Sequence, residues 1–128
     1  MELEGLRSVI ERDLADAAIP GLSADRCFAT AYNAALQSAK MAIACAGYRV
    51  SGPGAHQASF EAVQLAVGTG IANLAAYFET CRRKRNTLDY DVAYVTSDAE
   101  AADVLQKADE FRREVEAWIA KHHPQYVP

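Results

Sequence analysis

A stripe of small apolar residues along one helical stretch constrains the fold of this chain more than any other feature. Its members recur at the spacing of one helix face: Phe28, Tyr32, Ala35, Ala39, Ala42 and Ala46. Ser23 is a favourable N-cap for this helix, and Gly47 suits the left-handed position after its last turn. Because alanine lets another backbone approach closely, the helix needs a close neighbour. That neighbour is either another helix of the same bundle or a second copy of the chain.

Apolar residues at helical spacing predict four further helices. They cover residues 2 to 17, a shorter stretch around 60–67, residues 71–81 running on into a charged segment, and a last helix that "HHP" ends at 122–124. "GTG" at 68–70 separates the middle two, and Ser97 with Glu100 forms a capping-box pattern before the last. No alternating pattern predicts a strand. We therefore expect a single all-α domain over residues 1–128, a bundle of four to five helices whose tail, residues 122–128, frays. The aromatic packing is expected from Phe28, Tyr32, Phe78, Phe111 and Trp118.

Composition limits the classes of function. The chain has 128 residues, 51% of them hydrophobic, which suits one core, and its net charge of -4 argues against general electrostatic binding of duplex nucleic acid. Any contact with nucleic acid must be local. Cys27, Cys45 and Cys81 are widely spaced among alanines, so they are interpreted as reduced packing residues and not as a disulfide or zinc framework. With no basic leader and no long apolar run, we expect a cytoplasmic protein without a membrane span, a metal or another cofactor.

The segment "CRRKRNTLDYD", residues 81–91, is the densest cluster of charge. Cations at the end of a helix interact favourably with its dipole, so a solvated helix end is one interpretation. If the helix continues, Arg82 and Asn86 share a face with Asp89 or Tyr90, and Arg85 stands one turn before Asp89. An exposed pair of this kind stabilises a helix by only about 0.3 to 0.5 kcal/mol, which is a weak reason for so many cations.

Several stretches taken together resemble one known family. They are "DRCFATAYNAALQSAKMAIACAGYRV", "GAHQASFEAV", "RRKRNTLDYD" and "SDAEAADVLQKADEFRREVEAWI", in this order. The chain resembles the HEPN domain superfamily, in particular its small stand-alone bacterial and archaeal members. The resemblance implies an antiparallel helical bundle that forms a homodimer, with a cleft between the protomers for RNA or a nucleotide. Many relatives are toxins or defence proteins that cleave RNA without a metal.

The active sites of such relatives use an arginine followed after four to six residues by a histidine. The guanidinium stabilises charge on phosphorus while the imidazole moves a proton. Here Arg85 is followed at those distances by Asp89, Tyr90 and Asp91, and Arg82 has no histidine there either. An aspartate with an ordinary pKa near ~3.9, or a tyrosine near ~10, is a poor proton carrier at neutral pH. Arg82, Arg85 and Asn86 remain candidates for binding RNA or nucleotide phosphate.

Four residues are kept as catalytic candidates: Arg85, Asp89, Tyr90 and His56, of which His56 opens the third helix beside a glycine-rich loop. The alternative for His56 is a capping or surface residue. Tyr90 is either a packed ring or, by the resemblance, a tyrosine that a cognate nucleotidyltransferase modifies. His122 and His123 fall in the tail and are expected to be disordered. Arg26 and Asp89 are expected to form a structural ion pair in a polar centre.

Three functions follow. The favoured one is a HEPN-like dimer that binds RNA, a nucleotide or a partner protein such as an antitoxin, without full nuclease activity. The second is a metal-independent endoribonuclease toxin with a non-standard motif. The third is a structural adaptor.

Overall fold

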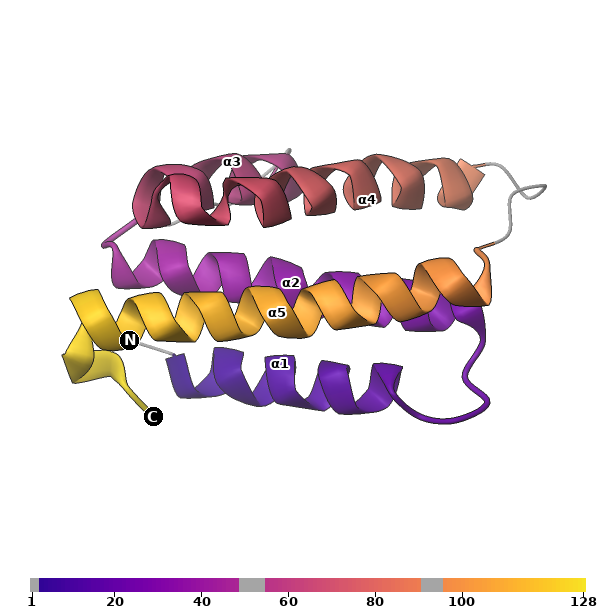
Figure 1. Cartoon of the computed structure of the whole chain (residues 1–128), viewed down its shortest axis with the longest axis horizontal. Helices are drawn as coiled ribbons and strands as arrows, with labels where there is room; N and C mark the ends of the chain where they lie inside the picture. The colour runs from indigo at the N-terminus through magenta and orange to yellow at the C-terminus, as the bar shows by residue number, and fades with distance from the viewer. Residues whose placement is uncertain (1–2, 49–54, 91–95) are drawn as a thin grey trace.

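The computed structural model of the chain is a bundle of five packed α-helices (Figure 1). It describes residues 3–48, 55–90 and 96–128, leaving aside the side chains of 55–57 and 85–90. The elements are α1 (Leu3–Ala17), α2 (Ala24–Cys45), α3 (Ala55–Val67), η1 (Thr69–Ile71), α4 (Ala72–Tyr90), α5 (Asp98–His122) and η2 (Pro124–Tyr126), of which η1 and η2 are short 3-10 turns. No strand occurs in these ranges, which confirms the all-α prediction. Over the same ranges, no helix combines the length and the apolar character that crossing a bilayer requires.

The alanine-rich helix α2 is the centre of the bundle. It packs against α1 and α5 on one side and against α3 and α4 on the other (Figure 1). Its small side chains have no exposed surface, as expected where helices approach closely: Ala31, Ala34, Ala35, Ala39 and Ala42 are all at 0%. Of the two neighbours that the sequence allowed, the structure shows helices of the same chain. The stripe therefore gives no argument for a second copy.

Aromatic rings from four helices meet beside α2. Phe60 stacks on Phe78 with ring centroids 5.7 Å apart, Phe111 meets Phe78 edge-on at 5.5 Å, and Tyr32 lies 5.9 Å from Phe60. All four rings are fully buried, and Phe28 is 2% exposed. Rings of this size dominate the apolar area that a small core can bury. The predicted aromatic core is confirmed, with Phe60 added to it and Trp118 only partly buried at its edge.

Three helix ends follow the local signals in the sequence. The Ser23 side chain accepts a hydrogen bond from the Arg26 amide at the start of α2. After α2, Gly47 has a φ of +89°, and the Gly47 and Tyr48 amides donate back to Ala44 and Ile43. This is the Schellman arrangement, which needs a residue free to adopt positive φ. At α5 the capping box of Ser97 and Glu100 is present.

The C-terminal tail differs from the expectation that it frays. Residues 124–126 form η2, and the Arg7 guanidinium of α1 donates to the Tyr126 carbonyl at 2.5 Å. The same guanidinium makes two 2.9 Å bonds to the Glu116 carboxylate of α5. His123 lies against Trp118, with ring centroids 4.9 Å apart. The tail stays ordered because α1 and α5 supply both polar and aromatic partners for it.

Packing accounts for the three thiols and for Asp13, the buried acid among the described side chains. Cys27, Cys45 and Cys81 are buried and unpaired, as predicted for packing residues, and burial raises the pKa of each thiol. Asp13 of α1 is 5% exposed and accepts a 2.7 Å hydrogen bond from the Asn33 side chain of α2. That bond satisfies the buried carboxylate and fixes α1 against α2.

Candidate functional site

The basic segment (residues 82–85) lies inside α4 and not at its end. The helix continues through Tyr90, and its last turn contains no basic residue. Of the two interpretations that the sequence left open, the structure favours a continuing helix over a basic helix end, because the dipole interaction is confined to the last turn. Nothing in "RRKRNTLDY" breaks a helix, since glycine and proline are both absent from it.

The register of α4 places part of this segment on the side that faces the bundle. Leu74, Phe78 and Cys81 are its buried residues at helical spacing. The same alternation of four and three residues leads next to positions 85 and 88, with position 89 at the edge of that face. Position 85 thus continues the row that Leu74, Phe78 and Cys81 form. The side chains of Arg85, Asn86, Asp89 and Tyr90 lie outside the described residues, and so do the interactions predicted for them.

Arg82 is already engaged within its own helix. Its guanidinium bonds the Glu79 carboxylate through Nε at 2.6 Å and Nη2 at 3.3 Å. Hydrogen bonding to Glu79 raises the pKa of Arg82 above its ordinary value, and Tyr32 and Glu61 act in the same direction. Both side chains of the pair are less than one fifth exposed, at 19% and 15%. The Glu79 carboxylate therefore occupies two of the donor groups that Arg82 could offer to an anion.

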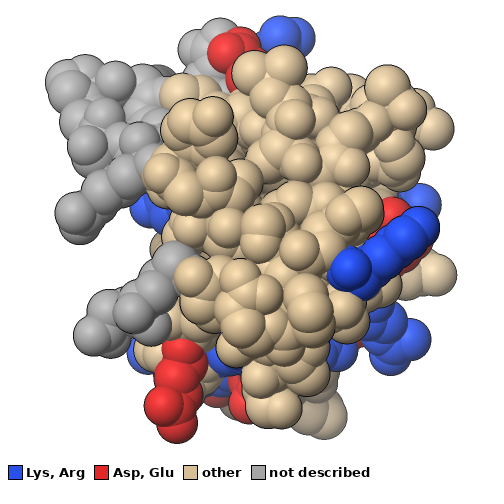
Figure 2. All heavy atoms as spheres, turned by 90° about the vertical axis from the view of Figure 1, so that its left-hand side faces the viewer, with Lys and Arg blue, Asp and Glu red and all other residues tan. Residues whose placement is uncertain are grey.

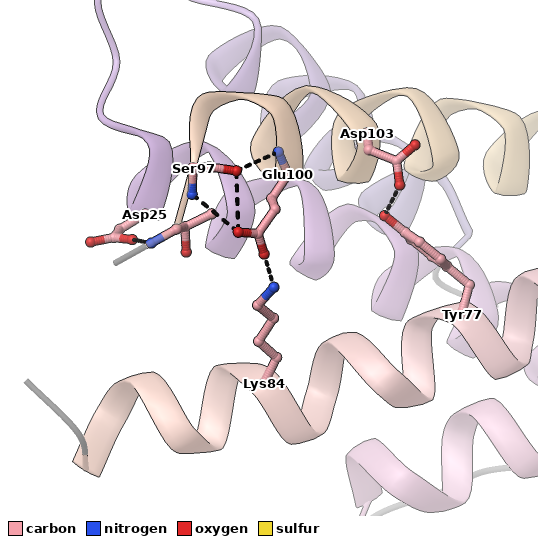
Figure 3. Close-up of polar contacts among 7 residues, drawn as sticks. Asp25, Tyr77, Lys84, Ser97, Glu100 and Asp103 are labelled. Atoms are coloured by element: carbon pink, nitrogen blue, oxygen red, sulfur yellow. Dashed lines mark hydrogen bonds and ion pairs between the residues drawn. The ribbon is translucent and has the colours of Figure 1, made fainter. Parts of the chain in front are cut away.

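Lys84 joins α4 to the beginning of α5. Its ammonium group forms an ion pair with one oxygen of Glu100, and both side chains are about one third exposed, at 32% and 33% (Figure 3). The other Glu100 oxygen accepts from the Ser97 amide at 3.4 Å and the Ser97 hydroxyl at 3.1 Å. Glu100 thus closes the cap of α5 and neutralises one cation of the basic segment at once.

A second polar bridge between α4 and α5 lies two turns nearer the middle of the bundle. The Tyr77 hydroxyl donates to Asp103 at 2.5 Å (Figure 3), and Tyr77 is also bonded to Cys81. Burial is the main reason why the pKa of Tyr77 lies above its usual range, and the bond to Asp103 adds to it. The hydroxyl therefore stays protonated at neutral pH. It holds the two helices together and is no proton acceptor.

The start of α3 lies level with the basic segment. Because α3 and α4 fold back on each other through η1 (Figure 1), the Phe60–Phe78 stack fixes their relative register. One turn before Phe60 is position 56, and one turn after Phe78 is Arg82. The backbone thus brings the positions of His56 and Arg82 to the same height, although the His56 side chain lies outside the described residues.

The other two histidines are far from this region. His122 ends α5 and His123 follows it, and both rings lie against Trp118. Figure 1 shows this end of α5 opposite the end at which α4 finishes. Seen from that side, the surface is mostly uncharged, with acidic and basic groups near its margin (Figure 2). This end offers a phosphate little electrostatic attraction.

The polar centre expected from Arg26 and Asp89 is not seen among the described groups. The Arg26 side chain is exposed, and that of Asp89 is among those outside the description. A neighbouring acid, Asp25, accepts a 2.9 Å hydrogen bond from the Thr96 amide (Figure 3). It anchors the start of α2 to the residue before the α5 cap.

A metal-ligand cluster or a surface depression is another way to form a site within the described part of the chain. Among the described residues no three His, Cys, Asp or Glu side chains are placed to hold a metal ion. A depression on the outer face of α5 is lined by Asp109, Glu110, Arg113 and Glu114 with two uncharged neighbours. Its mixed charges and its distance in sequence from the basic segment set it apart from that site.

Sequence reasoning missed Glu79, Glu100 and Tyr77 as parts of this region, and it gave Lys84 of the basic segment no partner. The three-residue spacing of Glu79 and Arg82 was a usable signal. The link from Lys84 to Glu100 had none, because it joins two helices across an intervening loop. Comparison of the chain with protein-family models, with curated proteins and with solved structures gives no match.

Proposed function

We propose that the chain is a HEPN-like antiparallel helical protein that binds RNA or a nucleotide through the basic segment of α4. In this proposal it acts as a homodimer in a toxin–antitoxin or defence setting, without full nuclease activity. The assignment and the dimer rest on the sequence resemblance. Binding to a partner protein such as an antitoxin or nucleotidyltransferase is a further part of that setting.

One observation carries the binding proposal, namely the unbroken course of α4 through Tyr90. It places Arg85 in register with Leu74, Phe78 and Cys81 on the side that faces the bundle. In general, a guanidinium close to an apolar helix face is costly without an anionic partner. A phosphate group suits it, because guanidinium binds two phosphate oxygens in one plane.

The lack of full nuclease activity follows from the proton carriers. No histidine stands four to six residues after Arg82 or Arg85. Tyr77, a described phenol of the same helix, holds its proton more tightly than usual. His122 and His123 lie at the opposite end of α5. None of these groups provides a base near neutral pKa at the basic segment, and without one attack by the 2′-hydroxyl gains little.

One alternative is a metal-independent endoribonuclease in which His56 moves the proton. It is favoured because the backbone brings position 56 to the same height along the bundle as Arg82. Both functions are tested with a fluorescent single-stranded RNA in buffer containing a chelator. We expect binding by the wild type that weakens with salt and falls about fivefold, or ~1 kcal/mol, in Arg85→Ala.

Arg113→Ala is the matched control, since Arg113 is an exposed cation of α5 paired with Asp109. Its affinity should equal that of the wild type. Equal affinities of wild type and Arg85→Ala would contradict the binding proposal. Cleavage that is lost in both Arg85→Ala and His56→Ala would instead establish the nuclease. If the wild type neither binds nor cuts RNA, a structural adaptor is the function that remains.

A further inference from the structure

Both described ion pairs of the basic segment use acids from the same chain. Glu79 holds Arg82 through two hydrogen bonds, and Glu100 holds Lys84 from the first turn of α5. A carboxylate bound to an arginine or lysine occupies the place that a phosphate oxygen would take, because both are oxyanions recognised by the same donors.

We propose that Glu79 and Glu100 are internal competitors of RNA, and that Lys84 is a phosphate-binding residue which Glu100 masks in the free protein. This inference rests on the proposed RNA binding. It adds Lys84 to the binding residues, and it describes an autoinhibitory contact between α5 and the basic segment.

The two pairs should open to different extents. Lys84 and Glu100 are about one third exposed and joined by a single lysine contact, so water and salt already weaken the pair. Arg82 and Glu79 are more enclosed and share two hydrogen bonds. An arriving phosphate therefore displaces Glu100 from Lys84 more readily than it displaces Glu79 from Arg82.

Glu100 also caps α5 through Ser97, and its charge can be removed without removing that cap. Glutamine is as acceptable as glutamate at the third position of a capping box, because its side-chain oxygen also accepts from the cap amide. Glu100→Gln therefore removes the charge that holds Lys84 while it keeps the cap on α5. A circular-dichroism melt of each variant checks that the fold is retained.

Glu110→Gln is the control. It makes the same change on the same helix, and Glu110 also has a lysine partner, Lys107, at 3.8 Å. It lies ten residues beyond Glu100, about 15 Å along the helix at ~1.5 Å per residue. Any general effect of one lost negative charge appears in this variant as well.

The assay measures the affinity of the labelled single-stranded RNA at several salt concentrations. We expect Glu100→Gln to bind about two- to fivefold more tightly than both the wild type and Glu110→Gln, as loss of a weak competing ion pair predicts. Adding Lys84→Gln to Glu100→Gln should remove the gain. Glu79→Gln provides a second variant that leaves the α5 cap untouched, and it should also tighten binding.

Two results would overturn the inference. If the wild type binds RNA in an Arg85-dependent way but Glu100→Gln and Glu79→Gln bind no more tightly than Glu110→Gln, the inference fails and the proposed function stands. If neither the wild type nor any of these variants binds, the proposed function fails and takes the inference with it.

Discussion

Alkaline pH should destabilise this protein through one buried thiol, Cys81 of α4. Its residue is 4% exposed, and burial is the main cause that raises the pKa of the thiol from 9.0 to about 11. The Tyr77 bond and the Lys84 charge lower it, but they do not offset the burial. The Cys81 thiolate is therefore less favourable in the folded protein than in the unfolded chain.

The sign and size of the effect follow from that difference. Because the folded pKa lies above the unfolded one, the contribution of Cys81 to stability is complete below pH 9 and is lost as the pH rises from 9 toward 11. Each unit of pKa difference corresponds to ~1.36 kcal/mol. By about pH 10 the unfolded thiol has lost most of its protons and the folded one few, so the expected loss is about 1.4 kcal/mol.

Urea unfolding followed by circular dichroism at pH 8, 9 and 10, with a reductant present, measures this loss. Other groups titrate over the same range, so the informative quantity is the difference between wild type and Cys81→Ala. At pH 8 the wild type should be more stable than Cys81→Ala, because the variant loses the buried sulfur. Between pH 8 and pH 10 the free energy of unfolding of the wild type should fall by about 1.4 kcal/mol relative to that of the variant. A difference that stays constant from pH 8 to pH 10 would refute the reasoning. Thr80→Ala, an exposed change on the same helix, should show no such pH dependence.

Two further predictions concern stability. Phe111→Ala should cost about 3 to 5 kcal/mol in urea unfolding, because the ring is fully buried, whereas Leu65→Ala should change stability by less than about 0.5 kcal/mol, because Leu65 is 89% exposed; similar losses in both would contradict the core assignment. Arg7→Met should cost about 1 to 3 kcal/mol and speed hydrogen exchange at the Tyr126 amide, because it leaves the Glu116 carboxylate unpaired and frees the tail. Unchanged exchange would show that Arg7 does not hold the tail.

Signals that act within one helix turn allowed most of the fold to be predicted. Ser23 and Ser97 cap helices with side chains that reach an amide three residues away, and Gly47 ends α2 by its own backbone freedom. The core rings Phe78 and Phe111 follow from helical spacing, since a face that repeats every three or four residues must be covered.

Contacts between distant parts of the chain could not be predicted in this way. Arg7 finds Glu116 only after α1 and α5 have packed, and the sequence offers many other acids as partners. The order of the tail depends on that same pair. At the candidate site, the sequence left the end of α4 open, because a run of cations is typical of a helix terminus although each residue in it also suits a helix interior.

The basic segment has two physical explanations that differ in the number of cations an anion can reach. Internal pairing alone explains Arg82 and Lys84, because Glu79 and Glu100 neutralise them. If those pairs persist when RNA binds, Arg82 and Lys84 add nothing to the salt dependence of the affinity. If the acids yield, both cations neutralise phosphate, and the logarithmic slope of single-stranded RNA affinity against salt becomes steeper by about 1.4, or ~0.7 for each phosphate neutralised, than in a variant that lacks both cations. The slope therefore distinguishes a basic segment whose paired cations only stabilise the bundle from one whose paired cations also bind RNA.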